Sequence, residues 1–428
     1  MNTNLTFLTL ATALFIGQAT CQAQDTLKLD LKLAEQIFLE KNFALLAQKA
    51  NISLIKAQEI QTKLWDNPQI SFEQSIYNPQ SKRAFPLRTE YADGTQGQNI
   101  FIVSQLFLLA GKRNKRFQMA QLETQIAEQD FYDLLRTLKY TLRTTFYDLY
   151  YTQQIIKIYE EQIASISVTI QLLNEQYKKG NVAWKEVIRL KSFLLTLQNE
   201  EKELFETIIE KQATLNTLLG ETKNIYYVPQ VSENYADRYQ LNKVSIQQLY
   251  ALAQENRQDL KKVALQKRLA ELNVNYQKAL AIPDLNVQAV YDRNGSYIPN
   301  YWGIGVGIQL PVFNRNQGNI ASAQKQLEVQ ALNEKASQNQ LLNEIIRTYN
   351  QALQIQKLYE SLDKNFINEF DKLFDNVQEN YQKKNITLLE FLDYYESYKS
   401  NIIHINQLQN QRRQIFEQIN YIVGTEVF

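Results

Sequence analysis

The chain contains very little of the chemistry from which catalytic and metal sites are built. Among its 428 residues there is one cysteine, Cys21, and one histidine, His404. A soft-metal site needs several cysteine or histidine ligands, and a Ser/His catalytic set needs a histidine beside its nucleophile. Paired catalytic groups that could share a cleft are not visible either. We therefore expect neither an enzyme nor a bound cofactor.

Helix breakers and net charge are also scarce. The chain has 12 glycines and 7 prolines, and its 46 basic residues balance 45 acidic ones to a net charge of +1. So few glycines and prolines indicate a mainly helical protein. The charge balance argues against a nucleic-acid binder, which needs a basic face. After the first residues, no run of about 18 uncharged apolar residues occurs, so we expect no transmembrane helix.

The start of the chain predicts export. Residues 5–16 are apolar, and small and polar residues follow as far as Ala23. This pattern is typical of a secretory signal peptide, here residues 1–23, although the usual basic start is missing. Cleavage after Ala23 would leave the mature chain without cysteine, so no disulfide could form. The alternative is that Cys21 carries a lipid at the mature N-terminus.

One long stretch, residues 113–177, has neither glycine nor proline over 65 residues. A continuous helix there would be roughly 98 Å long, because an α-helix rises about 1.5 Å per residue. Apolar residues recur in this stretch at intervals of seven, at Leu135, Leu142, Leu149, Ile156, Ile163, Ile170 and Tyr177. A second, mostly apolar set lies three positions after the first, and the two sets together form an a/d pattern typical of a coiled coil.

The second half of the chain repeats the first at a constant spacing. Five pairs of residues each lie 204 positions apart, namely Gln105 and Gln309, Tyr177 and Tyr381, Asn181 and Asn385, Glu186 and Glu390, and Gly220 and Gly424. Each repeat is predicted to contain a helix, a β-hairpin, a long helix, a turn and a last helix. The first repeat is 24–220, with a helix at 33–67, a hairpin at 69–107 and helices at 113–177 and 182–219. A connector at 221–244 precedes the second repeat, 245–424, with a helix at 245–282, a hairpin at 285–310 and helices at 320–384 and 386–423.

The last predicted strand, residues 301–310, indicates where the strands lie. One face is apolar throughout and the other is small or polar, over about the 9 to 11 residues that a strand needs to cross a bilayer. Residues 285–291 alternate in the same way, whereas residues 99–107 are apolar on both faces. In 301–310, the apolar residues Trp302, Ile304, Val306, Ile308 and Leu310 alternate with Gly303, Gly305, Gly307 and Gln309.

Four strands cannot close a membrane barrel by themselves. Open strand edges are not tolerated in lipid, and the smallest membrane barrels have about 8 strands. Several chains must therefore contribute strands to one barrel. The alternative is an exported coiled-coil scaffold or adhesion protein without a channel. Such a protein has no reason to alternate apolar residues with glycines in 301–310.

With these features the sequence resembles the TolC-type outer-membrane efflux factor family over essentially the whole mature chain. The resemblance rests on the helix-to-strand junctions at 64–68 and 281–283, on residues 308–318, and on the turns near Tyr177 and Tyr381. Within 308–318, the run Leu-Pro-Val-Phe-Asn-Arg-Asn-Gln-Gly is similar to the heavy-metal efflux branch, the CusC- and CzcC-like members.

The resemblance implies a mainly α fold with a small membrane β part. Three copies would form a homotrimer, in which four strands from each chain build a shared 12-stranded outer-membrane β-barrel above a periplasmic helical tunnel of about 100 Å. The connector would belong to an equatorial belt. The implied partners are a periplasmic adaptor and an inner-membrane pump, and the duct would carry metal cations or small toxic molecules.

The two turns between long helices are the predicted adaptor-docking tip. In the family this turn carries a Gly-Leu/Val-x-Ser-like sequence, of which residues 180–183 keep a part and residues 384–387 keep less. A structural explanation also exists, because any helical hairpin needs a turn and lysines are favoured near helix C-termini. The candidate docking residues are Lys178, Lys179, Gly180, Asn181, Val182, Lys383, Lys384, Asn385 and Ile386.

Three carboxylates near the second turn are candidates for a gate. Asp371, Asp375 and Glu379 recur at intervals of four and share one helix face. In three subunits they would form acidic rings that constrict the tunnel and attract cations. The alternative is an ordinary solvated helix surface.

Aromatic and basic residues mark the predicted membrane interface. Trp65, Phe107 and Trp302 lie near strand ends, as in the aromatic belts of membrane proteins. Four cations begin the long helix, where the helix dipole disfavours positive charge. Their position after the second strand would place them at the periplasmic rim near anionic head groups, with a role in solubility as the alternative. These cations are Lys112, Arg113, Lys115 and Arg116.

Overall fold

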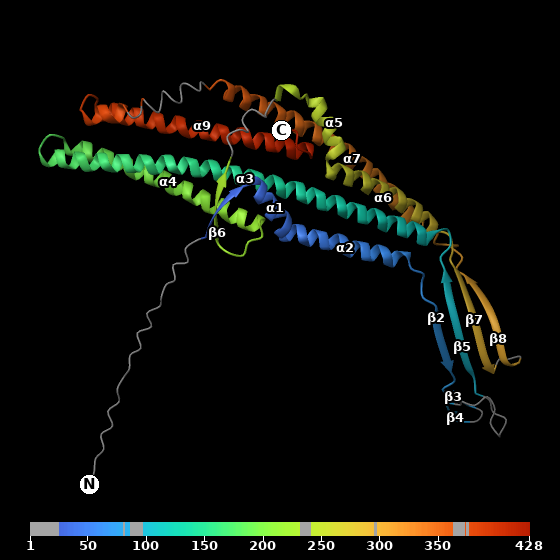
Figure 1. The fold of residues 1–428 in the computed structure, drawn as a ribbon. Coiled ribbons are helices and arrows are strands. Elements are labelled where there is room, and N and C mark those ends of the chain that lie inside the picture. The colour runs from blue at the N-terminus through green and yellow to red at the C-terminus, as the bar shows by residue number, and fades with distance from the viewer. Residues whose placement is uncertain are drawn as a thin grey trace, which may run out of the picture.

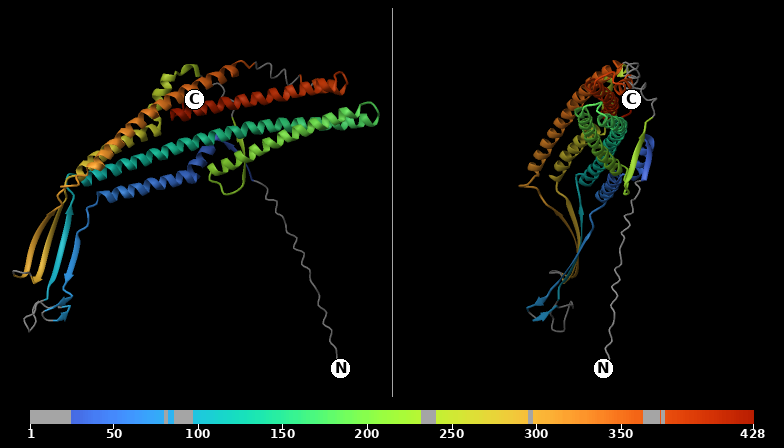
Figure 2. Two further views of the ribbon diagram at one scale, coloured as in Figure 1. Left: turned by 180° about the vertical axis from the view of Figure 1, so that it is seen from behind. Right: turned by 90° about the vertical axis from the view of Figure 1, so that its left-hand side faces the viewer.

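The computed structural model describes residues 25–79, 82–85, 97–231, 241–294, 298–362, 373 and 376–428. The predicted signal peptide lies outside these residues. Long helices run side by side, with a small sheet extending from one end and helical turns at the other (Figure 1). The view from behind shows the same elongated arrangement, whereas the view from the end shows the long helices foreshortened (Figure 2). Among the described helices, none is both long enough and apolar enough to cross a membrane.

The predicted long helix is α3, Lys112–Lys178, whose 67 residues span roughly 100 Å. It turns back into α4, Trp184–Leu218. The predicted seam of α3 is buried at Leu142, Leu149 and Ile156, whereas Tyr177 at its end is 42% exposed. The seam therefore forms a core along the middle of the helix but leaves its far end open.

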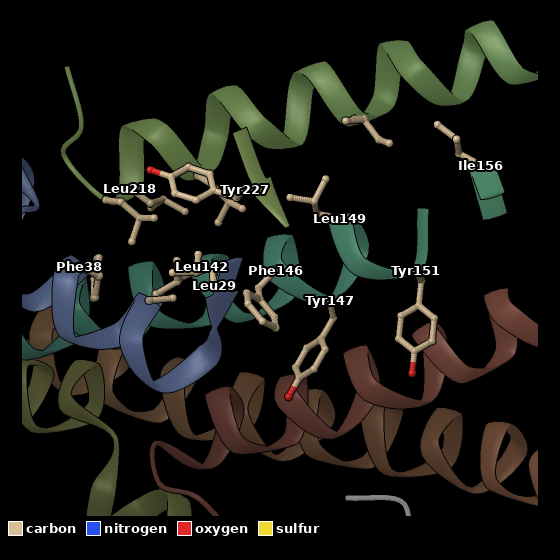
Figure 3. Close-up of a cluster of buried hydrophobic side chains, with 14 of the residues drawn as sticks. Leu29, Phe38, Leu142, Phe146, Tyr147, Leu149, Tyr151, Ile156, Leu218 and Tyr227 are labelled. Atoms are coloured by element: carbon tan, nitrogen blue, oxygen red, sulfur yellow. The ribbon is translucent and has the colours of Figure 1, made fainter. Parts of the chain in front are cut away.

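Two clusters of buried side chains divide the seam between different neighbours. Near the middle of the molecule, Leu142, Phe146 and Leu149 pack with Phe38 and Tyr227 (Figure 3). Closer to the turns, α3 and α4 pack with α9, Leu388–Val423, around side chains that include Ile166, Leu190 and Phe391. The heptad pattern thus serves two different packing environments on one helix.

The opening helix predicted at 33–67 is in fact two helices. They are α1, Leu31–Lys41, and α2, Phe43–Lys63, and Asn42 between them has an extended backbone with φ −63° and ψ 115°. The Asn42 carboxamide oxygen accepts a hydrogen bond from the Leu45 amide at 3.0 Å, which caps α2. Because the cap lets α2 begin directly after the break, the apolar periodicity of the sequence continues through Asn42. The periodicity therefore does not reveal the break.

The helix predicted at 245–282 is broken at the matching place. It comprises α5, Ile246–Asn256, and α6, Gln258–Leu280, with Arg257 between them at φ −71° and ψ 122°. Each break packs against the glycine that ends the last helix of its repeat. A β-carbon on Gly220 would lie 2.4 Å from the Lys41 carbonyl oxygen, and one on Gly424 would lie 3.2 Å from the Asn256 carbonyl oxygen.

The helix predicted at 320–384 also ends early. It is α7, Gln317–Glu360, and Ser361 caps its end. Glu360 interrupts the apolar seam, and the Ser361 hydroxyl donates to the Leu358 carbonyl at 2.7 Å, a local bond that competes with helix continuation. Residues 376–382 are helical again and lead into the second turn.

The predicted connector contributes a small ribbon. Strand β6, Ile225–Gln230, pairs in parallel with β1, Asp25–Asp30, which the sequence pattern did not predict. The Gln212 carboxamide accepts from the Tyr227 amide at 2.9 Å and donates to the Tyr227 carbonyl at 2.7 Å, so α4 satisfies the second edge of β6. A short 3-10 helix, η2, Leu241–Lys243, follows.

The main sheet has four antiparallel strands in the order β2-β5-β7-β8. A separate pair, β3, Tyr77–Asn78, and β4, Arg83–Ala84, lies in the loop after β2. The four strands continue a layer in which α2, α3, α6 and α7 pack side by side in the same order. The strands are β2, Gln69–Gln74, β5, Asn99–Phe107, β7, Leu285–Asn294, and β8, Pro299–Ile308.

This architecture confirms the predicted fold class, a mainly helical chain with a four-stranded main sheet to which each half contributes two strands. The exact division at residues 220 and 244 stays a prediction. Strand β5 has the predicted bounds. Strand β8 begins and ends two residues before the predicted 301–310, because its register opposite β7 pairs Pro299 with Asn294 and Ile308 with Leu285.

Candidate functional site

The register of the sheet gathers apolar side chains from all four strands on one face. In one row, Ile70 on β2 lies beside Val103 on β5, which lies beside Ala289 on β7 and then Ile304 on β8. Ile70 is 63% exposed and Ile304 is 84% exposed. Although Gln105 on β5 interrupts this face beside Val287, so large an exposed apolar surface fits an apolar environment.

The opposite face is polar at both edges and mixed in the middle. Ser71 on β2 and Gly303 on β8 flank Ile102 and Val290, which lie side by side on β5 and β7. The space above Gly305 is filled by the Gln288 side chain, since an added β-carbon would lie 2.7 Å from its amide nitrogen. This explains why residues 99–107 are apolar on both faces, as β5 has apolar neighbours on each side of the sheet.

Two groups of aromatic side chains border the apolar face. One is a row across the strands formed by Phe72, Phe101, Tyr291 and Trp302. The other is at the helix end, where the Trp65 and Phe107 rings meet at 6.3 Å. Phe101 and Phe107 are six residues apart on β5, which corresponds to about 20 Å. The apolar band of outer-membrane barrels is about 25 Å tall and is flanked by aromatic girdles.

The four predicted rim cations do not share one environment. Lys112 is 3% exposed, and its ammonium group lies 2.7 Å from the Asp284 carboxylate and 2.6 Å from the Ile282 carbonyl. Its predicted contact with lipid head groups is therefore wrong, because this ion pair ties α3 to the segment before β7. Arg113 instead stacks on Trp65, with its guanidinium carbon 3.8 Å from the ring centre.

The two predicted tip turns have the same backbone hydrogen bonds. The Asn181 amide donates to the Gln176 carbonyl, and the Asn385 amide donates to the Asn380 carbonyl, both at 2.9 Å. Gly180 has φ +76°, and its counterpart Lys384 has φ +61°, a left-handed conformation that a lysine adopts at a cost. The sequences differ, but the turn type is the same.

The structure brings the two turns together around one cavity. A cavity of about 530 Å³ lies between the two hairpins, and four predicted docking residues line it, namely Asn181, Val182, Lys384 and Ile386. Lys178, Lys179, Gly180, Lys383 and Asn385 are not part of its lining. The tip therefore contains a groove rather than only two separate turns.

Residues that the sequence did not single out as functional form much of this groove. Tyr381 stacks on Phe391 with ring centres 4.4 Å apart, and its hydroxyl is buried without a hydrogen-bond partner. Burial, together with the nearby Glu186 carboxylate, raises the pKa of Tyr381 to about 12. Tyr381 and Glu186 each belong to a pair of the 204-residue repeat, and this was the available signal.

Of the predicted gate residues, Asp371 and Asp375 lie outside the described residues. Glu379 is exposed and forms an ion pair with Lys383, one turn further along the helix. The hydrogen bond from Lys383, followed by its charge, lowers the pKa of Glu379. Glu379 is thus negatively charged near neutral pH, but Lys383 partly neutralises it.

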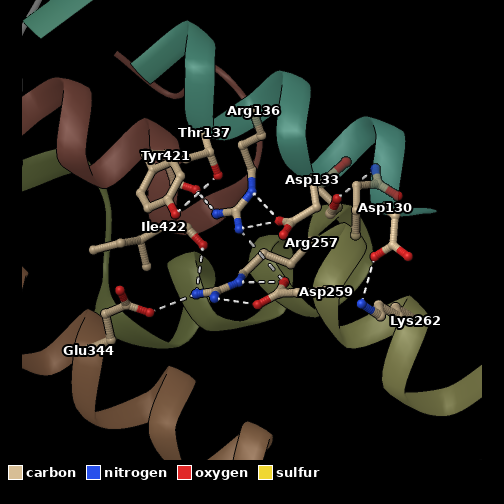
Figure 4. A network of polar contacts seen from close by, with 12 residues as sticks. Asp130, Asp133, Arg136, Thr137, Arg257, Asp259, Lys262, Glu344, Tyr421 and Ile422 are labelled. Atoms are coloured by element: carbon tan, nitrogen blue, oxygen red, sulfur yellow. Dashed lines mark hydrogen bonds and ion pairs between the residues drawn. The ribbon is translucent and has the colours of Figure 1, made fainter. Parts of the chain in front are cut away.

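A charged network in the middle of the molecule was not predicted. Arg257 donates to Asp259 and to Glu344, the latter at 2.7 Å, and Asp259 lies 3.9 Å from Arg136 on α3 (Figure 4). Nearby, Arg143 lies 3.1 Å from Glu417 on α9. Burial raises the pKa of Glu417, although Arg143 opposes this shift. Apart from the pair Arg257 and Asp259, these contacts join residues far apart in the sequence, so no local motif could show the network.

The protein is therefore an elongated helical bundle with two distinct ends. One end carries the exposed apolar face of the four-stranded sheet, and the other carries the groove between the two turns. The model of the outer membrane efflux protein family matches residues 249–425. A comparison with curated proteins found no match. Among the residues that the structure describes, no group of three histidine, cysteine, aspartate or glutamate side chains could hold a metal ion.

Solved structures share the fold over nearly the whole chain. CusC is 14% identical with a TM-score of 0.74, and the alignment covers 92% of each chain. VceC of Vibrio cholerae is 17% identical with a TM-score of 0.72, covering 93% of this chain and 97% of that one. CmeC of Campylobacter jejuni is 14% identical with a TM-score of 0.74, covering 92% and 85%. Together with the family match, these structures confirm the predicted resemblance to TolC-type outer-membrane efflux channels.

Proposed function

We propose that this chain is the outer-membrane channel of a tripartite efflux system, a passive duct formed by three copies. The observation that carries this proposal is the apolar sheet face, which continues across four strands and adjoins a helix of roughly 100 Å. Lipid is the environment that such a face fits. The helical part then lies in the periplasm.

The two flanks of the chain support assembly with further copies. Strands β2 and β8 are the sheet edges, and the alternation of directions makes them antiparallel to each other, so β8 of one copy can pair with β2 of the next. The helices that continue these edges are also apolar on the outside, since Leu54 on α2 is 55% exposed and Leu332 on α7 is 64% exposed. Three copies give a closed barrel of 12 strands, above the minimum of about 8.

The groove at the tip supports docking of a periplasmic adaptor. Leu172, Val182 and Ile386 give it an apolar lining, and Glu186 and Lys384 add one charge of each sign. An amphipathic helix with apolar anchors fits a groove of this kind. Because both turns contribute, a bound adaptor would act on both hairpins and open the tunnel, while the inner-membrane pump supplies the energy.

The gate stays part of this proposal. Asp371 and Asp375, with Glu379, would form acidic rings near the tip of the assembled tunnel. The test is the conductance of the double variant Asp371→Ala and Asp375→Ala in planar bilayers. Unchanged current and unchanged cation selectivity would remove these residues from the gate. The proposed cargo is metal cations or small toxic molecules, and the match to CusC agrees with the resemblance of residues 308–318 to the CusC- and CzcC-like members.

The membrane assignment can be tested with a matched pair of substitutions. Ile304→Lys places a charge on the apolar face, at a cost of about 2–4 kcal/mol in lipid. Asn286→Lys places the same charge on the opposite face of the sheet, where it meets water. We expect the first variant to be lost from the outer-membrane fraction and the second to remain there.

The alternative function, an exported scaffold or adhesion protein without a channel, predicts a different outcome. Both lysine variants would then fractionate alike, and the purified protein would not conduct ions in a planar bilayer. A mass of one chain in detergent would likewise contradict the trimeric duct. A mass of about three chains together with stable conductance is the expected result.

A further inference from the structure

The start of α3 carries positive charge that the chain itself does not neutralise. The first turn of α3 holds no acidic residue and has no side-chain cap. Lys112 is paired with Asp284, but within the described part of the chain no carboxylate lies within 4 Å of Arg113, Lys115 or Arg116. Because the helix dipole adds further positive charge at this end, an anion is strongly favoured there.

The fold does not require these cations. The corresponding first turn of α7, residues 317–321, reads Gln-Gly-Asn-Ile-Ala and has no charged side chain. Both helices follow a strand of the same sheet and begin after a residue in the left-handed conformation, Gly111 in one case and Asn316 in the other. A duplicated helix start is therefore basic in one copy and neutral in the other, which points to a function of the basic one.

Arg116 faces a cleft beside the end of α2. The cleft has a volume of about 500 Å³ and is lined by Arg116, Trp65 and Asp66, with Gln58, Gln61, Thr62 and Leu64. The Arg116 Nε atom is buried but has no hydrogen-bond partner. The Asp66 carboxylate does not lie within 4 Å of any Arg116 nitrogen. Because Arg116 as a whole is partly exposed and lines the cleft, its guanidinium group can donate to an anion bound there.

The aromatic contacts show which side of the sheet the cleft is on. Trp65 lines the cleft and contacts Phe107, which lies in the same row of the apolar face as Leu285 and Ile308. Arg113 stacks on the same Trp65 ring. The cations thus adjoin the end of the apolar face that is nearest the helices.

We propose that the phosphate of a phospholipid head group binds in this cleft, with Arg116 as its main donor and Arg113 beside it. The acyl chains then run along the apolar face past Trp65 and Phe107. This proposal rests on the proposed function, since it needs the sheet to lie in a membrane. Arginine suits the role because its guanidinium donates several hydrogen bonds to phosphate oxygens.

A neighbouring copy of the chain does not supply the missing anion. In the proposed assembly the flank formed by β8 and α7 adjoins α2, and the first carboxylate along α7 is Glu328. Glu328 lies 12 residues beyond Asn316, which corresponds to about 18 Å along the helix. Between Pro311 and Leu327, the charged residues are Arg315, which is exposed, and Lys325, and both have the same sign as Arg116.

The experiment is native mass spectrometry of the purified full chain in detergent with added lipid. Dioleoyl-phosphatidylglycerol is compared with dioleoylglycerol, which has the same acyl chains and no phosphate. We expect the phosphate-bearing lipid to be retained at least about tenfold more strongly, and Arg116→Gln to reduce this retention about tenfold. The matched control is Arg315→Gln, which removes an exposed arginine at the other flank and should change nothing.

Other outcomes would overturn the site. Equal retention of the two lipids would show that only the acyl chains are bound, and unchanged retention in Arg116→Gln would exclude this arginine. If inorganic phosphate displaced the lipid at millimolar concentration, the ligand would be a free anion. Circular dichroism checks that Arg116→Gln is folded, and Arg116→Lys, which keeps the charge, should restore part of the retention. Lipid retention is measured in detergent and does not depend on where the chain is located. If the chain is found in the outer membrane but shows no phosphate-dependent retention, the lipid site is refuted and the proposed channel function is not.

Discussion

The two repeats solve the same structural problem with different chemistry. In the first repeat, Asn42 interrupts the helix, and its side-chain Nδ2 atom donates to the Leu218 carbonyl at 2.8 Å. In the second, Arg257 stands at the break and reaches the Ile422 carbonyl, at a longer distance of 3.5 Å. Both side chains thus approach the carbonyl that lies two residues before the final glycine, Gly220 or Gly424.

The difference lies in what else these side chains contact. Asn42 is neutral and buried, and its bonds stay within the first repeat. Arg257 also binds Asp259 and Glu344, and Asp259 approaches Arg136 on α3 of the other repeat (Figure 4). The comparison shows that a duplicated backbone geometry can be kept while one copy acquires the charges that connect the two halves.

The largest expected effect tests how tightly each glycine is packed. Gly220→Ala should lower the free energy of unfolding by about 4 kcal/mol, because its β-carbon would meet the Lys41 carbonyl oxygen at 2.4 Å and its φ is +64°. Gly424→Ala, with a nearest contact of 3.2 Å, should cost only about 2 kcal/mol. The measurement is unfolding of the helical circular dichroism signal in detergent, and equal losses would contradict the packing difference.

The next effect compares the residues at the breaks. Arg257→Met should cost about 3 kcal/mol, because it leaves Glu344 without its counter-ion and Asp259 with only Arg136, at 3.9 Å, in a mostly buried place. Asn42→Ala removes a helix cap and one hydrogen bond and should cost about 1.5 kcal/mol. The same unfolding measurement applies. A larger loss for Asn42→Ala would mean that the charged network contributes little.

Lowering the pH should reduce the stabilisation at the Arg257 break but not that at the Asn42 break. Burial alone would raise the pKa of Asp259, but the hydrogen bond and the charge of Arg257 outweigh it and lower the pKa below its usual 3.8. A lowered pKa in the folded state stabilises the fold above the unfolded pKa, and this contribution is lost as pH falls through the folded value. Asp259→Asn should therefore be about 1 kcal/mol less stable at pH 7, a small value because its side chain is 34% exposed.

The control for this pH dependence is the difference between Asp259→Asn and the unaltered chain, which should shrink as the pH falls below 3.8 towards about 2.5. Melting temperatures between these two pH values provide the measurement. A difference that stayed constant over the whole range would show that the carboxylate acts through its shape rather than its charge. Asn42→Ala, which changes no titratable group, should lose the same stability at both pH values.

The smallest expected effect concerns the turns. Lys384→Gly should stabilise the second tip by about 0.5 kcal/mol, because glycine adopts a φ of +61° without steric cost. Gly180→Lys should destabilise the first tip by a similar amount. Hydrogen exchange of the Asn181 and Asn385 amides, which close the two turns, is the local measurement. Opposite signs for the two variants support the comparison, and equal signs contradict it.

The sequence predicted those features that depend on local pattern. The bounds of β5 and, within one residue at each end, those of α3 followed from glycine and proline positions and from apolar alternation. The helix breaks at Asn42 and Arg257 were missed, because neither residue is a helix breaker and the apolar period runs through both. Strand β1 was missed because its partner, β6, is far away in the sequence.

Prediction of the candidate sites had the same limit. The turns were found from their spacing, but the groove between them depends on how two hairpins lie side by side, so Tyr381 and Glu186 were not recognised as part of it. The rim cations were found as a cluster, but only the structure separates Lys112, which is paired with Asp284, from Arg116, whose Nε atom has no partner.

The sequence by itself determined the repeating order of helices and strands, the length of α3 and the apolar face of β8. These depend on periodicities of 3.6 and 2 residues, which a linear chain carries directly. Tertiary structure alone decided the order of the four strands, the pairing of charges between repeats and the clefts at the rim and the tip. Such features arise where side chains distant in sequence meet, and their energies depend on burial and distance, which no local pattern records.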